Sequence, residues 1–437
     1  MKDEIFFKDF NSKLPRYARE ALLPTLRKAF VHSFYRDFWK EYEFSESNIA
    51  DAFADLPSLK KELMANLLPE LDDGDSISTV THSSGSSGKL SFRFRSVREI
   101  DLSTRHFSEG PTGQQQKSKQ CISLVFPSFY HGTSRLNIES PGVVKIACSL
   151  TQDVFADHFL KLITGSVQIP GFEEGVSSVV GPLKDIQAAA ILLKKSSASV
   201  GGLYLGSYGG YLTKKWRKEI EEAFGSGLFH SYSVSEVGGG AIVCPKCGHL
   251  TFPPQILPHV NVVLRGRYAG RPIGTLSLTE LLPFGLCQPV VKFETGDIVA
   301  LVESSSTCCP AHIGGIKMLG RVATSLWSEK EPGKLVVSSN DIKEIFDSSF
   351  VQVGSSFRDL AAPRLDERLG SPIASLELGE GPLDINLIAR FKPNGDTETA
   401  QRQIRERCLA IVQSANPNAS IAVQVVPDVA MSKTLPK

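Results

Sequence analysis

The sequence predicts a layered α/β protein with a large N-terminal domain and a small C-terminal α+β domain. Its 437 residues exceed what one ordinary hydrophobic core holds, so two or three domains are expected. Between residues 121 and 240, apolar strand-like runs alternate with helical ones, which is typical of strands layered against helices. After Arg321 the pattern changes to that of a shorter unit. We therefore expect domains at residues 1–320 and 321–437.

Each element is predicted from its local pattern. Apolar residues at helical spacing predict one or two amphipathic helices over residues 16–42 and another over 58–68, whereas the polar stretch 103–119 predicts a loop. The central strands are predicted at residues 121–126, 143–147 and 202–205, and the central helices at 185–195 and 214–224. Residues 265–303 are richer in strands. The last unit is predicted to contain helices near 341–346 and at 397–415, and strands at 383–391 and 421–426.

The composition is that of a soluble globular protein, with 41% hydrophobic and 22% charged residues. A net charge of +1 gives no reason to expect nucleic acid or an anionic membrane as a partner. No apolar run approaches the length of about 18 residues that predicts a membrane span. The first residues lack the apolar region of a signal peptide, so the expected location is cytoplasmic. Eight cysteines are too few for a disulfide scaffold. Cysteines that lie close together in the sequence are therefore considered as metal ligands rather than as disulfides.

A loop of hydroxyls, glycines and one lysine is the most informative local feature. Its residues are Ser83, Ser84, Gly85, Ser86, Ser87, Gly88 and Lys89. Strand-like runs precede and follow it, at residues 77–80 and 90–94, so the setting differs from the strand-to-helix setting of a P-loop. Backbone N–H groups beside small residues can enclose phosphate oxygens, while hydroxyls and an ammonium add donors. By itself the loop is equally compatible with a flexible surface turn.

Three further sequence islands follow the loop. Tyr232 is followed four residues later by Glu236 and then by glycines, which places an aromatic ring, a carboxylate and open backbone close together. Asp297 follows Thr295 and Gly296 in a tight turn after a strand, where its carboxylate can accept two hydrogen bonds from a ribose diol. The third island is Gly320-Arg321. Each island alone is weak evidence.

In this order the motifs resemble those of the adenylate-forming superfamily, which includes acyl-CoA synthetases and nonribosomal peptide adenylation domains. Within it the short length and opening helices resemble the phenylacetate-CoA ligase branch, and acyl-protein synthetases are a close second. The resemblance covers about residues 15–437 and implies a large adenylation domain followed by a mobile C-terminal lid domain. It also implies ATP and Mg²⁺, with coenzyme A or a phosphopantetheine as acyl acceptor.

The resemblance also implies roles for individual residues. The loop from Ser83 to Lys89 would hold the β- and γ-phosphates of ATP, and Glu236 would ligate Mg²⁺ with help from Ser86. Asp297 and Arg321 would bind the ribose. The adenine would be held by Gly209, Gly210, Ser231 and Tyr232. The catalytic residues would be Lys437, Glu236 and Lys89, with Lys433 as the competitor of Lys437 and a disordered polar tail as the alternative to both.

Several positions depart from the family pattern. Tyr211 stands where the Gly-Gly-Glu motif has its acid, and Ser233 replaces the glycine after the motif tyrosine. The second threonine of the loop is Ser87, and the Asp-Asp that usually marks the domain hinge is missing after Arg321. We therefore expect altered adenine contacts and either a different hinge or a reduced domain rotation.

Two cysteine turns of the same form predict a structural zinc site. Cys244-Pro-Lys-Cys247 and Cys309-Pro-Ala-His312 together offer three thiolates and one imidazole, which suits tetrahedral Zn²⁺. Alternative fourth ligands are Cys308 and His249. Unliganded buried thiols and a redox pair are the competing interpretations. Of the remaining cysteines, Cys121, Cys148 and Cys287 are predicted to lie in the core, and Cys408 is a candidate acyl acceptor.

The predicted activity is ATP-dependent activation of a carboxylic acid to an acyl-adenylate, followed by thioester formation. The acceptor thiol would belong to coenzyme A, to a carrier protein, or to a protein cysteine as in an acyl-protein synthetase. The pocket is expected among residues 126–132, 206–211 and 237–241, where Phe129, Tyr130 and Tyr208 suit an aryl or medium acyl acid. His131 would either orient the carboxylate or lie on the surface. A non-catalytic nucleotide-binding descendant is the alternative; an acyl carrier protein and a second copy of the chain are candidate partners.

Overall fold

The structure is a computed structural model of the whole chain. It describes residues 16–42, 53–82, 91–109, 121–127, 143–167, 170, 175–261, 264, 267–302, 315–354 and 369–435. Within these residues, no helix is long and apolar enough to cross a membrane.

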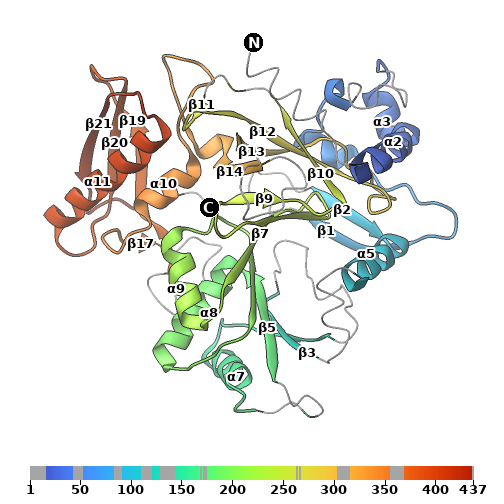
Figure 1. The fold of residues 1–437 in the computed structure, drawn as a ribbon, viewed down its shortest axis with the longest axis horizontal. Coiled ribbons are helices and arrows are strands. Elements are labelled where there is room, and N and C mark those ends of the chain that lie inside the picture. The colour runs from blue at the N-terminus through green and yellow to red at the C-terminus, as the bar shows by residue number, and fades with distance from the viewer. Residues whose placement is uncertain are drawn as a thin grey trace.

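The first helices confirm the amphipathic pattern predicted for residues 16–42. They are α2 (Arg16–Val31) and α3 (Ser33–Phe38), and both lie at the right of Figure 1. The helix predicted over residues 58–68 is wrong in extent, because only the 3₁₀ turn η2 (Lys61–Asn66) forms there. Leu59 pairs with the start of a later strand, at Phe293, and Pro69 disfavours helical backbone in the residue before it. These two constraints leave room for only a short turn.

A hairpin surrounds the Ser/Gly/Lys loop, as the sequence predicts. Strands β1 (Ile77–His82) and β2 (Phe92–Ser96) pair antiparallel, with His82 opposite Phe92. Helix α5 (Val97–Glu109) follows directly. The loop predicted at residues 103–119 is therefore wrong for residues 103–109, which are helical. Glu99 caps this helix by accepting from the Ser96 backbone N–H at 2.7 Å, a capping pattern that the polar composition concealed.

The described strands form one mixed sheet of twelve strands and several small sheets. Its parallel half contains β3 (Cys121–Val125), β4 (Val143–Ala147), β5 (Val176–Pro182), β6 (Tyr204–Tyr208) and β7 (Leu228–Val234). Its antiparallel half contains β8 (Gly239–Val243), β9 (His249–Thr251), β10 (Ile256–Asn261), β11 (Arg267–Tyr268), β12 (Arg271–Glu280), β13 (Phe293–Val302) and β14 (Gly315–Arg321). The path runs β10-β12-β13-β14-β9-β8-β7-β6-β5-β3-β4, and β11 pairs with β12. Strand β7 therefore joins the two halves.

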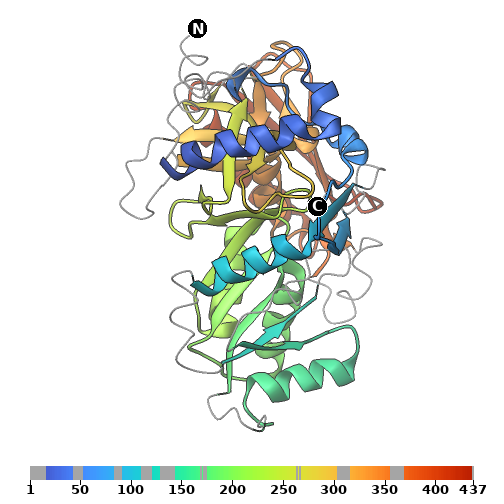
Figure 2. The same cartoon turned by 90° about the vertical axis from the view of Figure 1, so that its right-hand side faces the viewer.

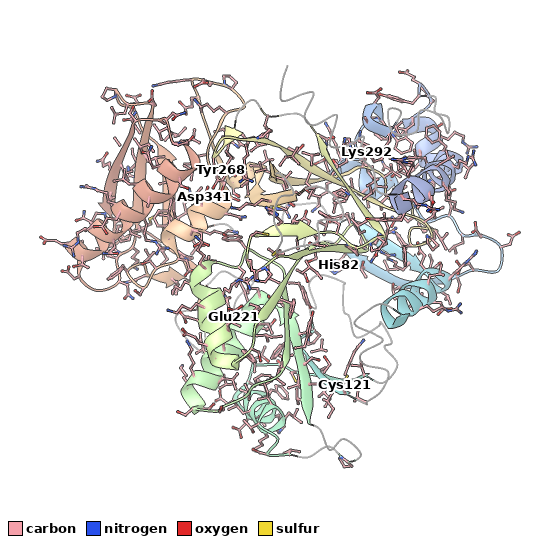
Figure 3. The ribbon with its side chains drawn as sticks, viewed as in Figure 1. His82, Cys121, Glu221, Tyr268, Lys292 and Asp341 are labelled. Atoms are coloured by element: carbon pink, nitrogen blue, oxygen red, sulfur yellow. The ribbon has the colours of Figure 1, made fainter. Side chains whose placement is uncertain are left out.

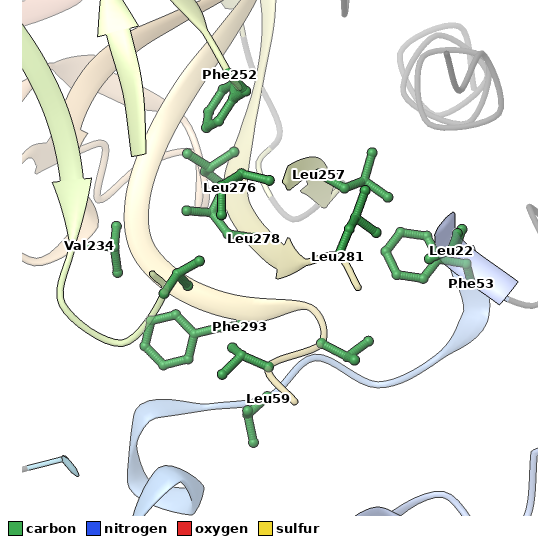
Figure 4. Close-up of a cluster of buried hydrophobic side chains, with 14 of the residues drawn as sticks. Leu22, Phe53, Leu59, Val234, Phe252, Leu257, Leu276, Leu278, Leu281 and Phe293 are labelled. Carbon is green, nitrogen blue, oxygen red and sulfur yellow. The ribbon is translucent and has the colours of Figure 1, made fainter. Parts of the chain in front are cut away.

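Two hydrophobic clusters cover the two halves. Helices α7 (Asp153–Ile163), α8 (Leu183–Ser196) and α9 (Lys214–Phe224) supply one cluster beside the parallel strands, in the lower part of Figures 1 and 2. The antiparallel half packs against the N-terminal helices, and Figure 4 shows Leu22 and Phe53 beside Leu281 in this second cluster. The layered α/β prediction is confirmed.

The residues after Arg321 contain the predicted α+β elements, at the left of Figure 1. The strands of this C-terminal unit are β15 (Leu326–Trp327), β16 (Leu335–Val337), β17 (Val353–Gly354), β18 (Ser371–Pro372), β19 (Ala374–Leu378), β20 (Ile385–Phe391) and β21 (Ile421–Pro427). Its helices are η4 (Val322–Thr324), α10 (Ser339–Phe346) and α11 (Thr397–Ala415). These elements enclose a hydrophobic cluster of their own. The division at residues 320 and 321 and the mobility of this unit stay predictions.

Candidate active site

Three of the predicted site residues meet where the large sheet curls. The Tyr232 hydroxyl donates to Oδ2 of Asp297 at 2.7 Å, and Nε of Arg321 lies 2.9 Å from Oδ1. Asp297 and Arg321 are cross-strand partners on β13 and β14, but Tyr232 is on β7, which three strands separate from β13. A direct bond over that separation requires a strongly twisted sheet that brings its own strand ends together.

The electrostatics of this cluster depend on burial. Asp297 is only 3% exposed, and burial raises the pKa of its carboxyl, against the opposing effects of Arg321 and the Tyr232 hydrogen bond. Burial also raises the pKa of the Tyr232 hydroxyl, which therefore stays protonated and donates. Lys343 on α10 interacts electrostatically with Asp297 and Arg321, and burial lowers its pKa to about 8. Lys343 is a charged neighbour that no motif pointed to.

Arg321 connects the large sheet to helix α10. Its Nη1 donates to the Thr295 carbonyl at 2.6 Å, and its backbone N–H donates to Oγ of Ser339 at 2.8 Å. Its side chain is 56% exposed, so one face of the guanidinium stays accessible. Such an arginine can hold the carboxylate and still offer donors to a ligand.

The turn after β6 contains the predicted adenine-binding glycines. Gly209 and Gly210 have φ of +72° and +78°, a backbone conformation that glycine adopts without strain. Ser207 and His230, which are partners in the parallel register of β6 and β7, support this turn. Nε2 of His230 lies 3.2 Å from the Gly210 carbonyl, and its Nδ1 lies 2.9 Å from Oγ of Ser207. A carbonyl only accepts, so Nε2 carries the proton and Ser207 donates to Nδ1.

His230 contacts the predicted adenine-binding turn, and the sequence reasoning gave it no role. Burial lowers its pKa to about 4, so the imidazole is neutral near pH 7 and its tautomer is fixed by Gly210. It directly precedes Ser231, a predicted adenine-binding residue whose strand partner is Tyr208. The signal that would have found it is the pairing of β6 with β7, which a single sequence does not reveal.

Glu236 lies beside the hairpin that surrounds the Ser/Gly/Lys loop. Its Oε1 accepts from Oγ of Ser91 at 3.0 Å and lies 3.4 Å from Nζ of Lys61. Ser91 is the second residue after Lys89 in the sequence. The loop residues Ser83, Ser84, Gly85, Ser86, Ser87, Gly88 and Lys89 lie outside the described residues, so their predicted roles are not tested. Lys61 was not foreseen.

Buried arginines attach strand β2 of this hairpin to the large sheet. Arg93 and Arg95 on β2 both pair with Glu280 at the end of β12, and Arg95 does so at 2.7 Å. Gly238 lies against this pair, since a Cβ there would come within 1.2 Å of Nη2 of Arg95. Gly238 thus leaves room for the guanidinium and lets the turn lie close to β2.

Tyr211, which replaces the acid of the family motif, binds the C-terminal unit instead. Its hydroxyl donates to Oε1 of Glu344 at 3.0 Å, and the Lys214 backbone N–H donates to the same oxygen at 3.1 Å. Nearby, Thr213 donates to Asp347, and Nζ of Lys215 lies 3.2 Å from Oδ1 of that residue. We call these contacts between residues 211–215 and helix α10 the turn–α10 contacts.

A second connection joins α10 to the antiparallel half. The Tyr268 hydroxyl lies 2.8 and 2.7 Å from the two carboxylate oxygens of Asp341, and Figure 3 shows the two side chains side by side. Helix α10 is therefore held by contacts from both halves of the large sheet.

The zinc prediction is only partly covered by the described residues. Cys244 and Cys247 lie in the tight connection from β8 to β9, where the Gly248 N–H donates to the Cys244 carbonyl. Cys309, His312 and the alternative Cys308 lie outside the described residues. The residues that the structure describes contain no cluster of three or more metal-ligating side chains. Zinc at this place stays a prediction.

Of the remaining candidate residues, the structure describes two and leaves the others outside the described residues. Cys408 is fully buried, and burial raises the pKa of its thiol to about 12, which argues against the proposed acyl acceptor role. Lys433 is exposed just before Leu435, whose backbone N–H donates to the Pro372 carbonyl, and the choice among Lys433, Lys437 and a disordered tail stays a prediction. Phe129, Tyr130, His131 and Lys437 lie outside the described residues.

Comparison with known proteins gives structural matches only. No protein-family model and no curated protein sequence matches the chain. Solved structures do match. An open conformation of 2-hydroxyisobutyryl-CoA ligase, in complex with 2-HIB-AMP and CoA, matches with a TM-score of 0.62 at 15% identity, over 96% of this chain and 90% of that one. The fold is that of the adenylate-forming CoA ligases.

Two other structures match with lower TM-scores. The same ligase in its thioester-forming state has a TM-score of 0.50 at 15% identity, over 97% of this chain and 89% of that one. The anthranilate CoA ligase AuaEII, in complex with anthranoyl-AMP, has a TM-score of 0.52 at 14% identity, over 82% and 66%. The matches confirm the predicted fold, and the phenylacetate-CoA ligase branch stays a prediction.

Proposed function

We propose that this protein uses ATP to activate a carboxylic acid as an acyl-adenylate and then transfers the acyl group to a thiol. The observation that carries the proposal is the joining of Tyr232, Asp297 and Arg321 across the curled sheet. These side chains come from three separate sequence islands and form a buried acceptor with an accessible arginine. Similar folds bind acyl-AMP and CoA, which supports both half-reactions.

The described residues suit the handling of a nucleotide. The Asp297 carboxylate would accept from the ribose hydroxyls, with Tyr232 and Arg321 fixing its orientation. The glycine turn at Gly209 and Gly210, held by His230, would lie against the adenine. In the first step a carboxylate oxygen of the acid attacks the α-phosphorus and the bond to pyrophosphate breaks. In the second step a thiolate attacks the acyl carbon and AMP leaves.

The Glu236 environment fits a hard divalent cation. A carboxylate and a hydroxyl, from Glu236 and Ser91, are the oxygen donors that Mg²⁺ prefers. Bound there, Mg²⁺ would supply charge neutralisation to the phosphates. Lys89 and Lys437 would add donors to the developing charge.

Finer assignments belong to the same proposal. We propose an AMP-forming acid–thiol ligase of the phenylacetate-CoA ligase type in the cytoplasm, with an aryl or medium acyl acid as substrate and coenzyme A as acceptor. The C-terminal unit, residues 321–437, would be a mobile lid, and Cys244, Cys247, Cys309 and His312 would hold a structural zinc. The proposal also includes a carrier protein as alternative acceptor and a homodimer. The similar structures do not support either of these.

Pyrophosphate release in the presence of a panel of carboxylic acids tests the activity. We expect release with at least one aryl or medium acyl acid, and a thioester when coenzyme A is added. ATP binding without release for any acid would reject the ligase. Release with no acceleration by coenzyme A would instead favour an acyl-protein synthetase, whose acceptor would then be a partner's cysteine rather than the buried Cys408.

One observation favours the non-catalytic alternative. The position of the family's acid is taken by Tyr211, which bonds to Glu344 on α10 and so uses the motif for a structural contact. If that contact prevents the lid from rotating, nucleotide binding would survive without turnover. The pyrophosphate assay separates the two functions directly.

A further inference from the structure

The Glu236 carboxylate already has a cationic partner, and that partner comes from the N-terminal part of the chain. Nζ of Lys61 lies 3.4 Å from Oε1 of Glu236, the same oxygen that accepts from Ser91. The Glu236 side chain is 8% exposed and that of Lys61 is 25% exposed, so the pair is open on the lysine side. An ammonium therefore occupies a position from which it neutralises the predicted metal ligand.

The backbone around Lys61 is fixed independently of this contact. Leu59 donates to the Lys292 carbonyl and accepts from the Glu294 N–H, at 3.0 and 2.9 Å, which attaches the segment to the start of β13. The turn η2 begins at Lys61 itself. Only the flexible four-carbon side chain can therefore move, and its ammonium can reach a new anion without a change in the fold.

We infer that Lys61 is a phosphate-binding residue of the nucleotide site. Its ammonium pairs with Glu236 while no nucleotide is bound and turns to the phosphates when ATP binds, and a divalent cation, where present, then replaces it at the Glu236 carboxylate. The Glu236 carboxylate and a polyphosphate are both anions and would otherwise repel each other across this site. The Lys61 ammonium reduces that repulsion by pairing with the anion that has no metal ion bound. The inference rests on the proposed function, since it assigns a residue to the same site.

The test compares Lys61→Met with Lys60→Met, its exposed neighbour, in direct binding titrations. ATP is titrated in EDTA and at a series of Mg²⁺ concentrations, and adenosine is the phosphate-free probe. We expect Lys61→Met to weaken ATP binding in EDTA by on the order of tenfold or more, which is the usual size of a charged hydrogen bond. The Mg²⁺ concentration for half-maximal ATP binding should fall, because Glu236 loses its competing ammonium. Adenosine binding should stay within about twofold of wild type.

Further variants distinguish a loss of phosphate binding from a general loss of folded structure. Lys61→Arg keeps the charge and should restore most of the ATP affinity in EDTA, whereas Glu236→Gln should retain that affinity and lose the Mg²⁺ response. If wild type binds ATP and Lys61→Met matches Lys60→Met, Lys61 has no phosphate role, and the proposed function is unaffected. If Lys61→Met weakens adenosine as much as ATP, the residue acts only on structure and the inference is wrong. If wild type binds no ATP at all, both proposals are overturned.

Discussion

At the scale of single residues, Asp297 is the most constrained acceptor in the site. Both of its carboxylate oxygens have partners: the Tyr232 hydroxyl donates to Oδ2, and Nε of Arg321 lies beside Oδ1. Asp297→Asn should weaken ATP binding by about 10- to 100-fold, because hydrogen bonds to a charged group contribute roughly 1.5–3 kcal/mol. Tyr232→Phe, which keeps the ring, should weaken ATP binding by less than about tenfold, because Tyr232 acts on the ribose only through its hydrogen bond to Asp297.

The ribose itself provides the control for this prediction. Wild type should bind ATP more tightly than 2′,3′-dideoxy-ATP, and Asp297→Asn should lose most of that preference. Isothermal titration with both nucleotides measures the difference. A variant that still discriminates fully between the two would show that Asp297 does not bind the ribose.

His230 predicts a specific dependence of stability on pH. Its pKa is lowered to about 4 in the folded protein, while the unfolded chain has an ordinary value near 6.5. Between these values the unfolded state binds a proton that the native state does not, so stability is present above pH 6.5 and is lost as the pH falls towards 4. The full loss is about 3 kcal/mol for a shift of this size.

Urea unfolding of wild type and His230→Asn at pH 7.5 and 4.5 measures that loss. The variant should be less stable than wild type at pH 7.5, because Asn cannot reproduce both bonds to Ser207 and Gly210. The difference in the free energy of unfolding between wild type and variant should be smaller at pH 4.5, because the variant has no imidazole that could become protonated. An equal gap at both pH values would contradict the assigned protonation state.

At the scale of elements, the turn–α10 contacts make helix α10 part of the site. The Tyr211 hydroxyl and the Lys214 N–H converge on one oxygen of Glu344. A double-mutant cycle of Tyr211→Phe and Glu344→Gln should show a coupling energy of about 1 kcal/mol in the free energy of unfolding. Tyr204→Phe, an exposed tyrosine on β6, serves as the control and should not couple to Glu344→Gln. A coupling within error of zero would mean that the contact does not form in solution.

The elements with a regular apolar period could be predicted from the sequence, because their burial pattern follows that period. Helix α11 and strands β20 and β21 match the predicted ranges closely, since each alternates or repeats its apolar residues regularly. The prediction failed where long-range pairing decided the structure. Leu59 is fixed by Phe293, more than 200 positions away, and this pairing shortens the following helix to η2.

The candidate site shows the same division. The motifs gave Tyr232, Asp297 and Arg321, which the structure brings together. Lys61 and His230 carry no local signal, because a lysine in a short turn and a histidine on a strand acquire their contacts only from residues distant in the sequence. Predicting them requires the register of β6 against β7 and the position of the N-terminal segment.

At the scale of the whole molecule, helix α10 connects the large sheet to the C-terminal unit. The turn–α10 contacts lie on one side and the Tyr268–Asp341 contact on the other. If the C-terminal unit rotates between the two half-reactions, α10 must release both sets of contacts or stay behind while the rest of the unit moves. These contacts therefore stabilise the present arrangement over any rotated one in which α10 moves with the unit.

That reasoning predicts a change in the balance of the two half-reactions. In the double variant Tyr211→Phe/Glu344→Gln, a loss of about 1 kcal/mol from the present arrangement should raise the population of rotated forms roughly fivefold. Thioester formation should then speed up relative to ATP–pyrophosphate exchange, measured with the same acid and with coenzyme A present in one reaction only. Tyr204→Phe should leave the ratio unchanged. A ratio equal to wild type, in a variant whose coupling energy has been shown to be lost, would mean that α10 does not move during turnover and that the hinge lies after it.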